Sequence, residues 1–352
     1  MNIKVTQEVL DNPLWYPLLD VVVAILQQRD IRHAFDVSQY DTIAASPWLS
    51  GALGARASTA EFIRSSSKAA NRDISSDAVT LMIDDLAPPC GETVDKRVIR
   101  VYPLAALAIL MQPLYVIVED ENSDGAFVLW MARLLGLDAI QRSYRAGRLM
   151  FRHAGGKNQF AKSAKALSFG VWPRDDEPIL SLQLRAIALL DSDAHFPGDS
   201  PNAQIVQDVK AHVAFVHMLN GRFIESYVPE HFFHLRLDKD RKGPKVHAYF
   251  RLTESQRNHF PIKDGFMDNA TPPQPQDYVT FLADRRRKQE ERDLYRTVDP
   301  RDWVQLAAGM GSGVASVYQD KGYRCQHNTR ELLTRNQQTE LNALLTRVIR
   351  YL

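Results

Sequence analysis

The chain has 352 residues, of which 45% are hydrophobic and 24% are charged, and its formal net charge at pH 7 is +1. This length predicts two or three domains, and the composition is typical of a globular protein with a sizeable core. The near-zero charge excludes a chain-wide basic field, so any contact with nucleic acid has to use a local patch.

Membrane, secretory and disulfide-rich classes are not expected from the first part of the chain or from its cysteines. The most apolar early stretch, Leu14 to Leu26, is short and contains Asp20, which predicts a core helix and no membrane span. No secretory signal pattern precedes it. Cys90 and Cys325 form no Cys-x-x-Cys pair, so a cytoplasmic protein without a disulfide framework or a cysteine zinc site is expected.

Residues 1–112 are predicted to be a mostly helical region. Apolar residues recur at helical spacing over 5–28, and further helices are expected at 51–71 and 75–86. Residues 97–111 read as a helix or a strand–helix pair, with Pro103 near the helix start. No pattern in this region indicates chemistry, so a packing or interaction module is expected.

From Leu114 onward, short strands alternate with helices, which predicts a parallel sheet in an α/β domain over residues 113–270. The expected strands are 114–118, 149–151 and 187–190, and the expected helices are 124–137, 158–167 and 203–219, with loops over 138–148 and 171–178. A proline-rich linker over 271–276 then leads into a helical C-terminal region, 271–352, with helices at 278–296 and 330–351.

Acidic residues follow the first of these strands directly. Glu119, Glu121 and Asp124 come within six positions after Val118. Because open parallel sheets bind ligands at the carboxyl ends of their strands, Glu119 is expected at a functional rim. The alternative is that these side chains cap the next helix, and Asp124 in particular suits an N-cap.

A second strand ends in Asp191-Ser192-Asp193. Two aspartates at i and i+2 after a buried strand repel each other at pH 7, and a divalent cation relieves that repulsion. The sequence therefore predicts a Mg²⁺ site where the two acidic strand ends meet. A polar turn closed by the aspartates' own backbone is the alternative.

Two later segments add an acid and a base. Glu225 stands among apolar residues in Arg222-Phe-Ile-Glu-Ser-Tyr-Val-Pro, and Lys263 stands in Phe-Pro-Ile-Lys-Asp-Gly-Phe. A lysine placed in this way can point its ammonium group at a developing phosphate charge. The alternatives are a solvated glutamate on an edge strand and a surface lysine in a turn.

The ordered series of these motifs resembles the TOPRIM catalytic domain in its OLD-nuclease-like form. The matching segments are Val-Glu-Asp-Glu-Asn-Ser-Asp-Gly, Leu-Leu-Asp-Ser-Asp, an Arg222-x-x-Glu225-x-Tyr227 segment and a late Lys263-Asp-Gly265, which together cover roughly residues 114–268. Two positions depart from the family: Asp120 replaces the usual glycine, and Ser226 replaces the usual asparagine.

The resemblance implies Mg²⁺- or Mn²⁺-dependent cleavage of phosphodiester bonds in DNA or RNA, with tRNA among the candidates. In the family, the counterpart of Glu119 binds metal or acts as general acid or base, and those of Asp191 and Asp193 bind metal. The counterpart of Glu225 serves a second metal, and that of Lys263 steadies transition-state charge. Asp124, Glu121 and Arg222 are secondary candidates. No separate domain with a nucleophilic tyrosine, as topoisomerases need, is identified, so a nuclease is the simpler expectation.

Standalone nucleases of this kind resemble toxic effectors of bacterial anti-phage systems that a partner ATPase holds in check. This chain has no nucleotide-binding loop of its own, so the ATPase would be a separate polypeptide that docks on the N-terminal helices. Self-association of the chain is left open.

Other patterns are weaker. Arg285, Arg286, Arg287 and Lys288 are the candidate nucleic-acid-binding run, with a solvated helix face as the alternative. Gly311-Ser312-Gly313 predicts a turn. His195 is expected to be a loop residue near the site. His231 and His234 lie three positions apart, but a zinc site there is not favoured because no cysteine is nearby.

Three other functions stay open. Asp-x-Asp also serves metal-dependent glycosyltransferases and haloacid-dehalogenase-type phosphatases. A phosphatase of that type favours Thr or Val two residues after the second aspartate, where this chain has His195, and a glycosyltransferase leaves Glu119, Glu225 and Lys263 unexplained. The third alternative is a TOPRIM-like fold kept as an interaction module.

Overall fold

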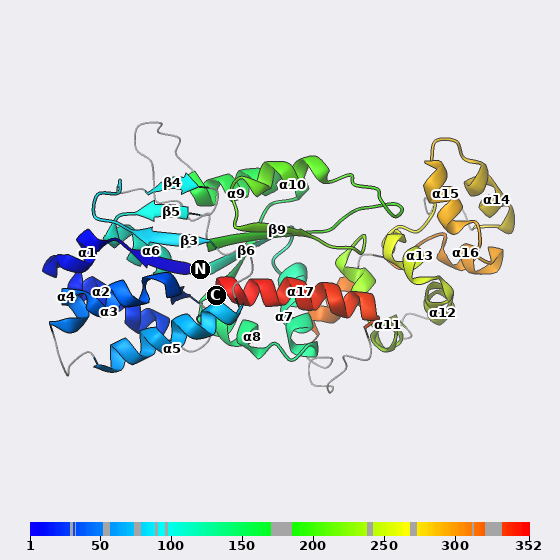
Figure 1. Ribbon diagram of the computed structural model, residues 1–352. Coiled ribbons are helices and arrows are strands. Elements are labelled where there is room, and N and C mark those ends of the chain that lie inside the picture. The colour runs from blue at the N-terminus through cyan, green and yellow to red at the C-terminus, as the bar shows by residue number, and fades with distance from the viewer. Residues whose placement is uncertain are drawn as a thin grey trace.

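The computed structural model describes residues 1–28, 31, 33–51, 57–73, 79–88, 91–95, 98–169, 185–237, 242–267, 273–311, 313–320 and 333–352. These residues form an α/β protein with two mainly parallel sheets flanked by helices, which confirms the predicted fold class (Figure 1). Both cysteines and the predicted loop over 171–178 lie outside the described residues. None of the described helices combines the length and apolar character that a membrane crossing requires.

The N-terminal unit is built on a five-stranded sheet in the order β2-β1-β3-β5-β4, in which only β4 is antiparallel to its neighbour. Helices pack on the apolar residues of this sheet, and the sheet and helices together form one hydrophobic core. The elements are β1 (Asn2–Val5), α1 (Gln7–Asp11), η1 (Pro13–Trp15), α2 (Tyr16–Leu26), β2 (Ala34–Phe35), η2 (Val37–Gln39), α3 (Tyr40–Ala45), α4 (Pro47–Ser50), α5 (Ala57–Asp73), β3 (Thr80–Ile83), β4 (Glu92–Asp95), β5 (Val98–Val101) and α6 (Pro103–Met111).

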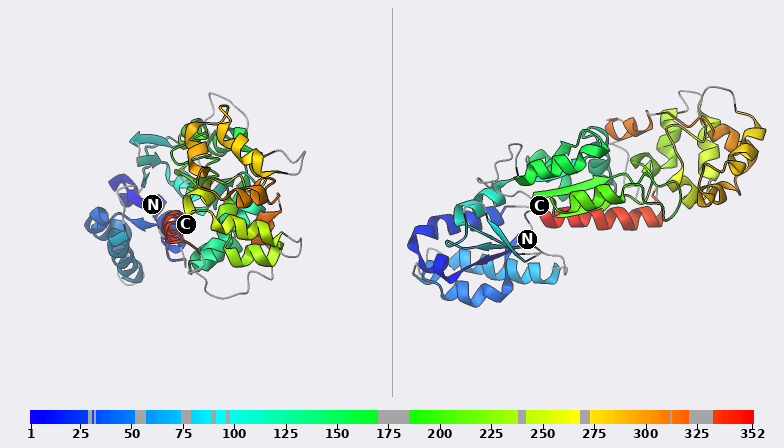
Figure 2. Two further views of the ribbon diagram at one scale, coloured as in Figure 1. Left: turned by 90° about the vertical axis from the view of Figure 1, so that its right-hand side faces the viewer. Right: turned by 90° about the horizontal axis from the view of Figure 1, so that it is seen from above.

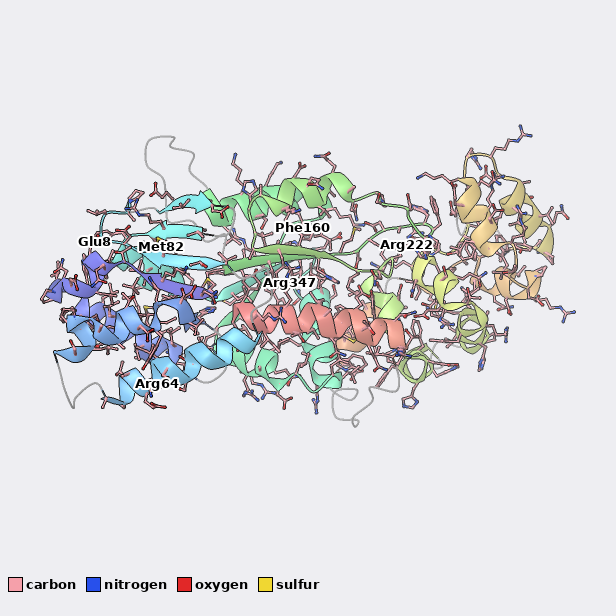
Figure 3. The ribbon with its side chains drawn as sticks, in the orientation of Figure 1. Glu8, Arg64, Met82, Phe160, Arg222 and Arg347 are labelled. Carbon is pink, nitrogen blue, oxygen red and sulfur yellow. The ribbon has the colours of Figure 1, made fainter. Side chains whose placement is uncertain are left out.

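The expectation of a helical N-terminal region is therefore corrected: the helices are present, but a sheet lies among them. Where a helix was expected over 75–86, residues Thr80–Ile83 form β3, and Met82 on this strand is labelled in Figure 3. The reason is length, because an apolar run of four residues has no periodicity that separates a buried strand from a helical turn. The strand–helix alternative for 97–111 is confirmed, with Pro103 as the first residue of α6.

The second sheet, with order β7-β6-β8-β9, is entirely parallel. Side chains alternate along each strand, so Leu114, Val116 and Val118 pack in one core, with α7 and the C-terminal helix α17 (Arg335–Tyr351). Ile117 packs in another core, with α9 and α10. The elements are β6 (Leu114–Val118), α7 (Ser123–Leu134), α8 (Asp138–Arg145), β7 (Leu149–His153), η3 (Lys157–Gln159), α9 (Phe160–Phe169), β8 (Ala186–Leu190), α10 (Ala203–Lys210) and β9 (Phe215–Met218).

Two predictions for this sheet were wrong. The expected loop over 138–148 contains α8, an eight-residue helix. The helix expected over 203–219 ends at Lys210, and Phe215–Met218 form the edge strand β9. In both segments, apolar and polar residues are spaced so that short helices and strands give similar patterns.

Beyond the second sheet the chain builds a helical lobe, residues 243–306, at the end of the molecule opposite the N-terminal unit (Figures 1 and 2). The single charged helix expected over 278–296 is two helices joined by a turn at 284–288. After the lobe, η7 (Val314–Gln319) packs against α7, and α17 (Arg335–Tyr351) packs against α7 and α8. The elements are η5 (Ile224–Tyr227), α11 (Glu230–Leu237), α12 (Gly243–Arg251), α13 (Glu254–His259), α14 (Pro275–Ala283), α15 (Gln289–Tyr295), α16 (Pro300–Leu306), η7 (Val314–Gln319) and α17 (Arg335–Tyr351).

One buried side chain, Arg185, connects the parts of the molecule. It is 2% exposed, and its guanidinium donates to the carbonyl oxygens of Gln112 and Tyr351 and lies 3.1 Å from Nε2 of His33. Burial lowers the pKa of Arg185 to about 10. Burial and the neighbouring positive charges lower the pKa of His33, so a neutral ring can accept the bond.

Candidate active site

Residues from six separate segments line one cleft of 370 Å³ at the carboxyl ends of β6 and β8. Parallel sheets present strand ends at one edge, which is why two distant strands deliver their following residues to the same place. Five carboxylates and two ammonium groups line the cleft: Glu119, Asp120, Asp124, Asp191 and Glu225, with Lys157 and Lys263. The carboxylate of Asp120 is engaged in a turn.

The loop after β6 is closed by its own aspartates. Oδ1 of Asp120 accepts from the amide of Asn122 and Oδ2 accepts from the hydroxyl of Ser123, while Oδ2 of Asp124 accepts from the amide of Asp120. Asp120, which stands where the resembled domain has glycine, is thus the turn-forming residue. Glu119 forms none of these bonds and lines the cleft.

The turn after β8 separates its two aspartates. Asp191 lines the cleft, whereas the carboxylate of Asp193 pairs with Lys157 and accepts from Nδ2 of Asn202 at 2.6 Å. Asp193 has φ of 53°, a left-handed conformation that its short polar side chain tolerates. The same amide of Asn202 donates to the carbonyl of Asp191. Asp193 is therefore close to the site, but its carboxylate is engaged by Lys157 and Asn202.

Glu225 lies at the base of the cleft on the short helix η5. It is 1% exposed, and Lys263 Nζ lies 3.2 Å from its Oε1. Its other oxygen, Oε2, is buried and has no hydrogen-bond partner within the described residues. The edge-strand alternative for this residue is excluded, because the segment is a 3₁₀ helix whose side chains are buried.

A pair of glycines holds the loop that carries Lys263. The amides of Met310 and Gly311 donate to the carbonyls of Ile262 and Lys263, so residues 262–267 and 307–311 run side by side. Gly265 and Gly309 meet in this pairing, both with positive φ (78° and 58°). A Cβ on Gly309 would come 2.5 Å from the amide nitrogen of Gly265, so the backbones approach closely only because both residues are glycine.

Glu340 on α17 supports the site through hydrogen bonds, a role that was not predicted from the sequence. Its Oε2 accepts from the hydroxyl of Tyr227 at 2.7 Å, and its Oε1 accepts from the amide of Asn220 at 2.7 Å. The Tyr227 hydroxyl in turn accepts from the amide of Gly221. A carboxylate on a terminal amphipathic helix looks like a solvated residue, so no sequence signal pointed to this role.

Lys157 was also missed, although a signal was present. It follows β7 after His153-Ala154-Gly155-Gly156, at the same sheet edge as the acidic strand ends. The strand-end rule that selected Glu119 and Asp191 applies equally to a basic residue. Lys157 joins Lys263 as a second ammonium group in the cleft.

Crowding of the carboxylates changes their acidity. Burial, together with the charges of Glu119, Asp120 and Glu225, raises the pKa of Asp124 to about 6. Burial, with the charges of Asp124, Glu225 and Asp193, raises the pKa of Asp191 well above its usual range. Raised carboxyl pKa values mark a site where additional positive charge is favourable.

The donor set of the cleft fits a hard divalent cation. Carboxylate oxygens are the ligands that Mg²⁺ and Mn²⁺ prefer, and the orphaned Oε2 of Glu225 is a buried acceptor without a donor. Within the described residues, however, no three His, Cys, Asp or Glu side chains are already arranged to hold a metal ion. The fit to a cation therefore rests on the carboxylate oxygens that Glu119, Asp124, Asp191 and Glu225 offer as ligands. The ammonium group of Lys263 compensates the charge of Glu225.

Other predicted residues lie outside this cleft. Arg222 stands at the end of the central sheet beside the helical lobe (Figure 3), where its carbonyl accepts from the amide of Asp193. Glu121 is exposed and lines a neighbouring pocket, not this cleft. His195 is 3.8 Å from Glu291, and His231 and His234 lie on α11, with His234 beside His247. Of the predicted turn 311–313, Ser312 is outside the described residues.

The basic run occupies the turn between α14 and α15, and three of its four members are paired. Arg286 pairs with Asp284 at 3.0 Å, Arg287 with Glu291 at 2.6 Å and Lys288 with Asp199 at 3.0 Å. Arg285 is exposed. The Lys288 pair connects the helical lobe to the loop after β8, so these residues have a structural role whatever else they bind.

No family model matches the chain, and searches of curated proteins and of solved structures found no match. The function is therefore argued from the cleft itself.

Proposed function

We propose that this chain is a Mg²⁺-dependent nuclease of the TOPRIM type that cleaves phosphodiester bonds in DNA or RNA. The observation that supports it most is the convergence of Glu119, Asp124, Asp191, Glu225 and Lys263 on one cleft from four separated segments. Carboxylates gathered around space for a cation, with lysine ammonium groups among them, suit phosphoryl chemistry.

In this proposal Glu119, Asp124, Asp191 and Glu225 hold the cation, which when bound supplies charge to stabilise the phosphoryl oxygens. Water attacks the phosphorus, its proton passes to Glu119, and the bond to the leaving sugar oxygen breaks as solvent protonates that oxygen. Lys263 balances the charge that builds on the phosphoryl group. Lys157 holds Asp193 and so keeps the Asp191 turn in place.

The contacts of Asp193 support this function over the phosphatase alternative. In such a phosphatase both aspartates of the motif must face the substrate, one as nucleophile and one as acid. Here Asp193 turns to Lys157 and Asn202 and only Asp191 lines the cleft. The glycosyltransferase alternative assigns no work to Glu225 and Lys263.

The test is cleavage of plasmid DNA, single-stranded DNA and total tRNA with Mg²⁺ or Mn²⁺. Wild type is expected to cut at least one substrate, and Asp191→Asn and Glu225→Gln to lose cutting. Asp208→Asn is the matched control, because that exposed carboxylate on α10 accepts from the side chain of Gln204 and lies outside the cleft, so its loss should leave cutting unchanged. Cutting retained by both cleft variants would contradict the proposal.

We further propose that the nuclease acts in the cytoplasm as a defence effector that a separate ATPase restrains, with the N-terminal unit (residues 1–111) as the docking surface. The unit has a core of its own, distinct from those of the catalytic sheet. Co-expression with a neighbouring-gene ATPase tests this: binding should be lost on substituting exposed residues of the unit, such as Leu14 and Leu86, and cutting should rise when the partner is removed. An unchanged complex would contradict the docking surface.

A further inference from the structure

A second pocket, of 420 Å³, lies beside the catalytic cleft between α7, α8, β7 and η7. Its volume is within the range of small-molecule sites. Of its lining residues, only Glu121 was a candidate site residue from the sequence. The pocket is lined by aromatic, arginine and amide side chains, chiefly Trp130, Tyr144, Phe151, Arg133, Arg145 and Gln141, and by one acidic residue, Glu121.

The aromatic side chains form the apolar floor of the pocket and leave one ring exposed at its mouth. Trp130 is 4% exposed and packs edge-on against Tyr318, which closes the bottom of the pocket. Tyr144 is 45% exposed, and its ring centroid is 5.6 Å from that of Phe151 at an interplanar angle of 48°. An exposed aromatic face at the mouth of a polar-rimmed pocket suits stacking by a planar ring.

Two positive charges accompany the rings. Arg133 on α7 and Arg145 at the end of α8 are exposed and line the same pocket. Within the described part of the chain, neither guanidinium forms an ion pair with a carboxylate. Arginine binds phosphate oxygens through several N–H groups, so a ligand that combines a planar ring with phosphate matches this combination.

Space for the stacked ring depends on Gly125. A Cβ at this position would come 3.0 Å from the ring of Phe151, so the ring of Phe151 lies directly against the backbone of α7. The polar rim is also ordered, because Nε2 of Gln141 donates to the carbonyl of Leu129 at 3.1 Å. The pocket is thus formed without a ligand, which lowers the entropic cost of binding one.

The pocket and the catalytic cleft are neighbours along the same helix. Ser123 and Asp124 at the start of α7 line the cleft, the next residues, Gly125 and Ala126, line the pocket, and Gln319 lines both. A nucleotide whose base enters the pocket would therefore place an adjoining phosphate toward the carboxylates.

We propose that this pocket binds an unstacked nucleobase of the substrate, next to the phosphate that is cut, and that the enzyme therefore acts on single-stranded nucleic acid or on unpaired loops. A base within a duplex is stacked on both faces and cannot enter a pocket unless it leaves the helix. This inference rests on the proposed nuclease function for its substrate class.

The test is binding without cleavage, measured by fluorescence anisotropy of labelled oligonucleotides with the Asp191→Asn protein. A single strand is expected to bind about tenfold more tightly than the duplex of the same sequence. Tyr144→Ala should weaken single-strand binding by about tenfold, as loss of one base–aromatic stack does, whereas Tyr144→Phe should bind like the parent. Met150→Ala is the matched control, because Met150 has the same 45% exposure on β7 but lies outside the pocket.

Three outcomes would overturn the proposal: single-strand binding unchanged in Tyr144→Ala, equal losses for strand and duplex, or mononucleotides that bind as tightly as the oligonucleotide. The last would identify the ligand as a free nucleotide. Failure of the proposed function is a separate result, namely no metal-dependent cutting by the wild type. A Tyr144-dependent preference for single strands would still stand in that case.

Discussion

The Nζ atom of Lys263 lies 3.2 Å from Oε1 of Glu225, at the base of the cleft, while Oε2 of the same buried carboxylate has no hydrogen-bond partner within the described residues. Glu225 itself raises the pKa of Lys263 through its charge, although burial alone would lower it. The lysine thus stabilises the buried carboxylate, and one acceptor remains for a second positive group.

Replacing Lys263 by Met is expected to destabilise the protein by about 2–3 kcal/mol, because it leaves the Glu225 carboxylate buried without a counter-charge. The free energy of unfolding in urea measures this loss, and added Mg²⁺ should recover part of it. The control is Lys288→Met, which removes an exposed ion-pair lysine and should cost less than about 1 kcal/mol. Equal losses in the two variants would show that Glu225 does not depend on the lysine.

Asp124→Asn is expected to stabilise the metal-free protein at neutral pH. Because the folded-state pKa of Asp124 is raised to about 6, the native protein holds a proton that the unfolded chain releases near pH 4. The stability that this group contributes is therefore complete below about pH 4 and is lost as the pH rises through about 6. Thermal melts from pH 4 to 8 should show a gain for Asp124→Asn at pH 8 of about 1–3 kcal/mol that vanishes toward pH 4. A gain independent of pH would contradict this account.

Glu340→Ala should lower both stability and cutting. The variant leaves the Tyr227 hydroxyl and the Asn220 amide without their shared acceptor, a cost of about 2–3 kcal/mol for bonds to a charged group. Because Tyr227 belongs to the helix that carries Glu225, the cleft should loosen as well. Glu340→Gln retains an acceptor oxygen and is expected to keep most of both properties. Full activity in Glu340→Ala would show that α17 does not brace the site.

Gly309→Ala and Gly311→Ala form a matched pair. Both glycines have positive φ, so alanine is strained at each by about 1 kcal/mol. Only Gly309 packs against the Gly265 backbone; the nearest heavy atom to a Cβ on Gly311 is Nζ of Lys242 at 3.9 Å. Gly309→Ala should therefore lose about 1–3 kcal/mol more in chemical denaturation and should displace Lys263. Equal free energies of unfolding for the two variants would show that the close approach of Gly309 to Gly265 adds no loss of stability.

Much of the second sheet could be predicted from the sequence because its strands are short apolar runs that are followed by charged residues. Leu114–Val118 was predicted at its observed bounds, and the residues after it and after Leu190 do line one cleft. What carried the prediction was the rule that parallel strands share a carboxyl edge. The rule needs no knowledge of the contacts between strands.

The rest depended on tertiary contacts that leave no local trace. The sheet in the N-terminal unit was missed because β1 and β3 become strands through pairing with each other, with Asn2 opposite Thr80 across a long stretch of chain. Asp193 looked equivalent to Asp191, and only its left-handed backbone and its pair with Lys157 distinguish the two. Glu340 reaches the site from more than a hundred positions away.

The buried guanidinium of Arg185 makes the second sheet depend on residues that precede it in the chain. A fragment that begins after Gln112 keeps the cleft residues but removes two of the partners of this buried cation, the carbonyl of Gln112 and the ring of His33. The fragment would then have to solvate a charge that the whole protein encloses. We expect a fragment that begins after Gln112 to express as insoluble protein and its Arg185→Met variant to recover solubility, so cleavage assays belong on the 352-residue chain.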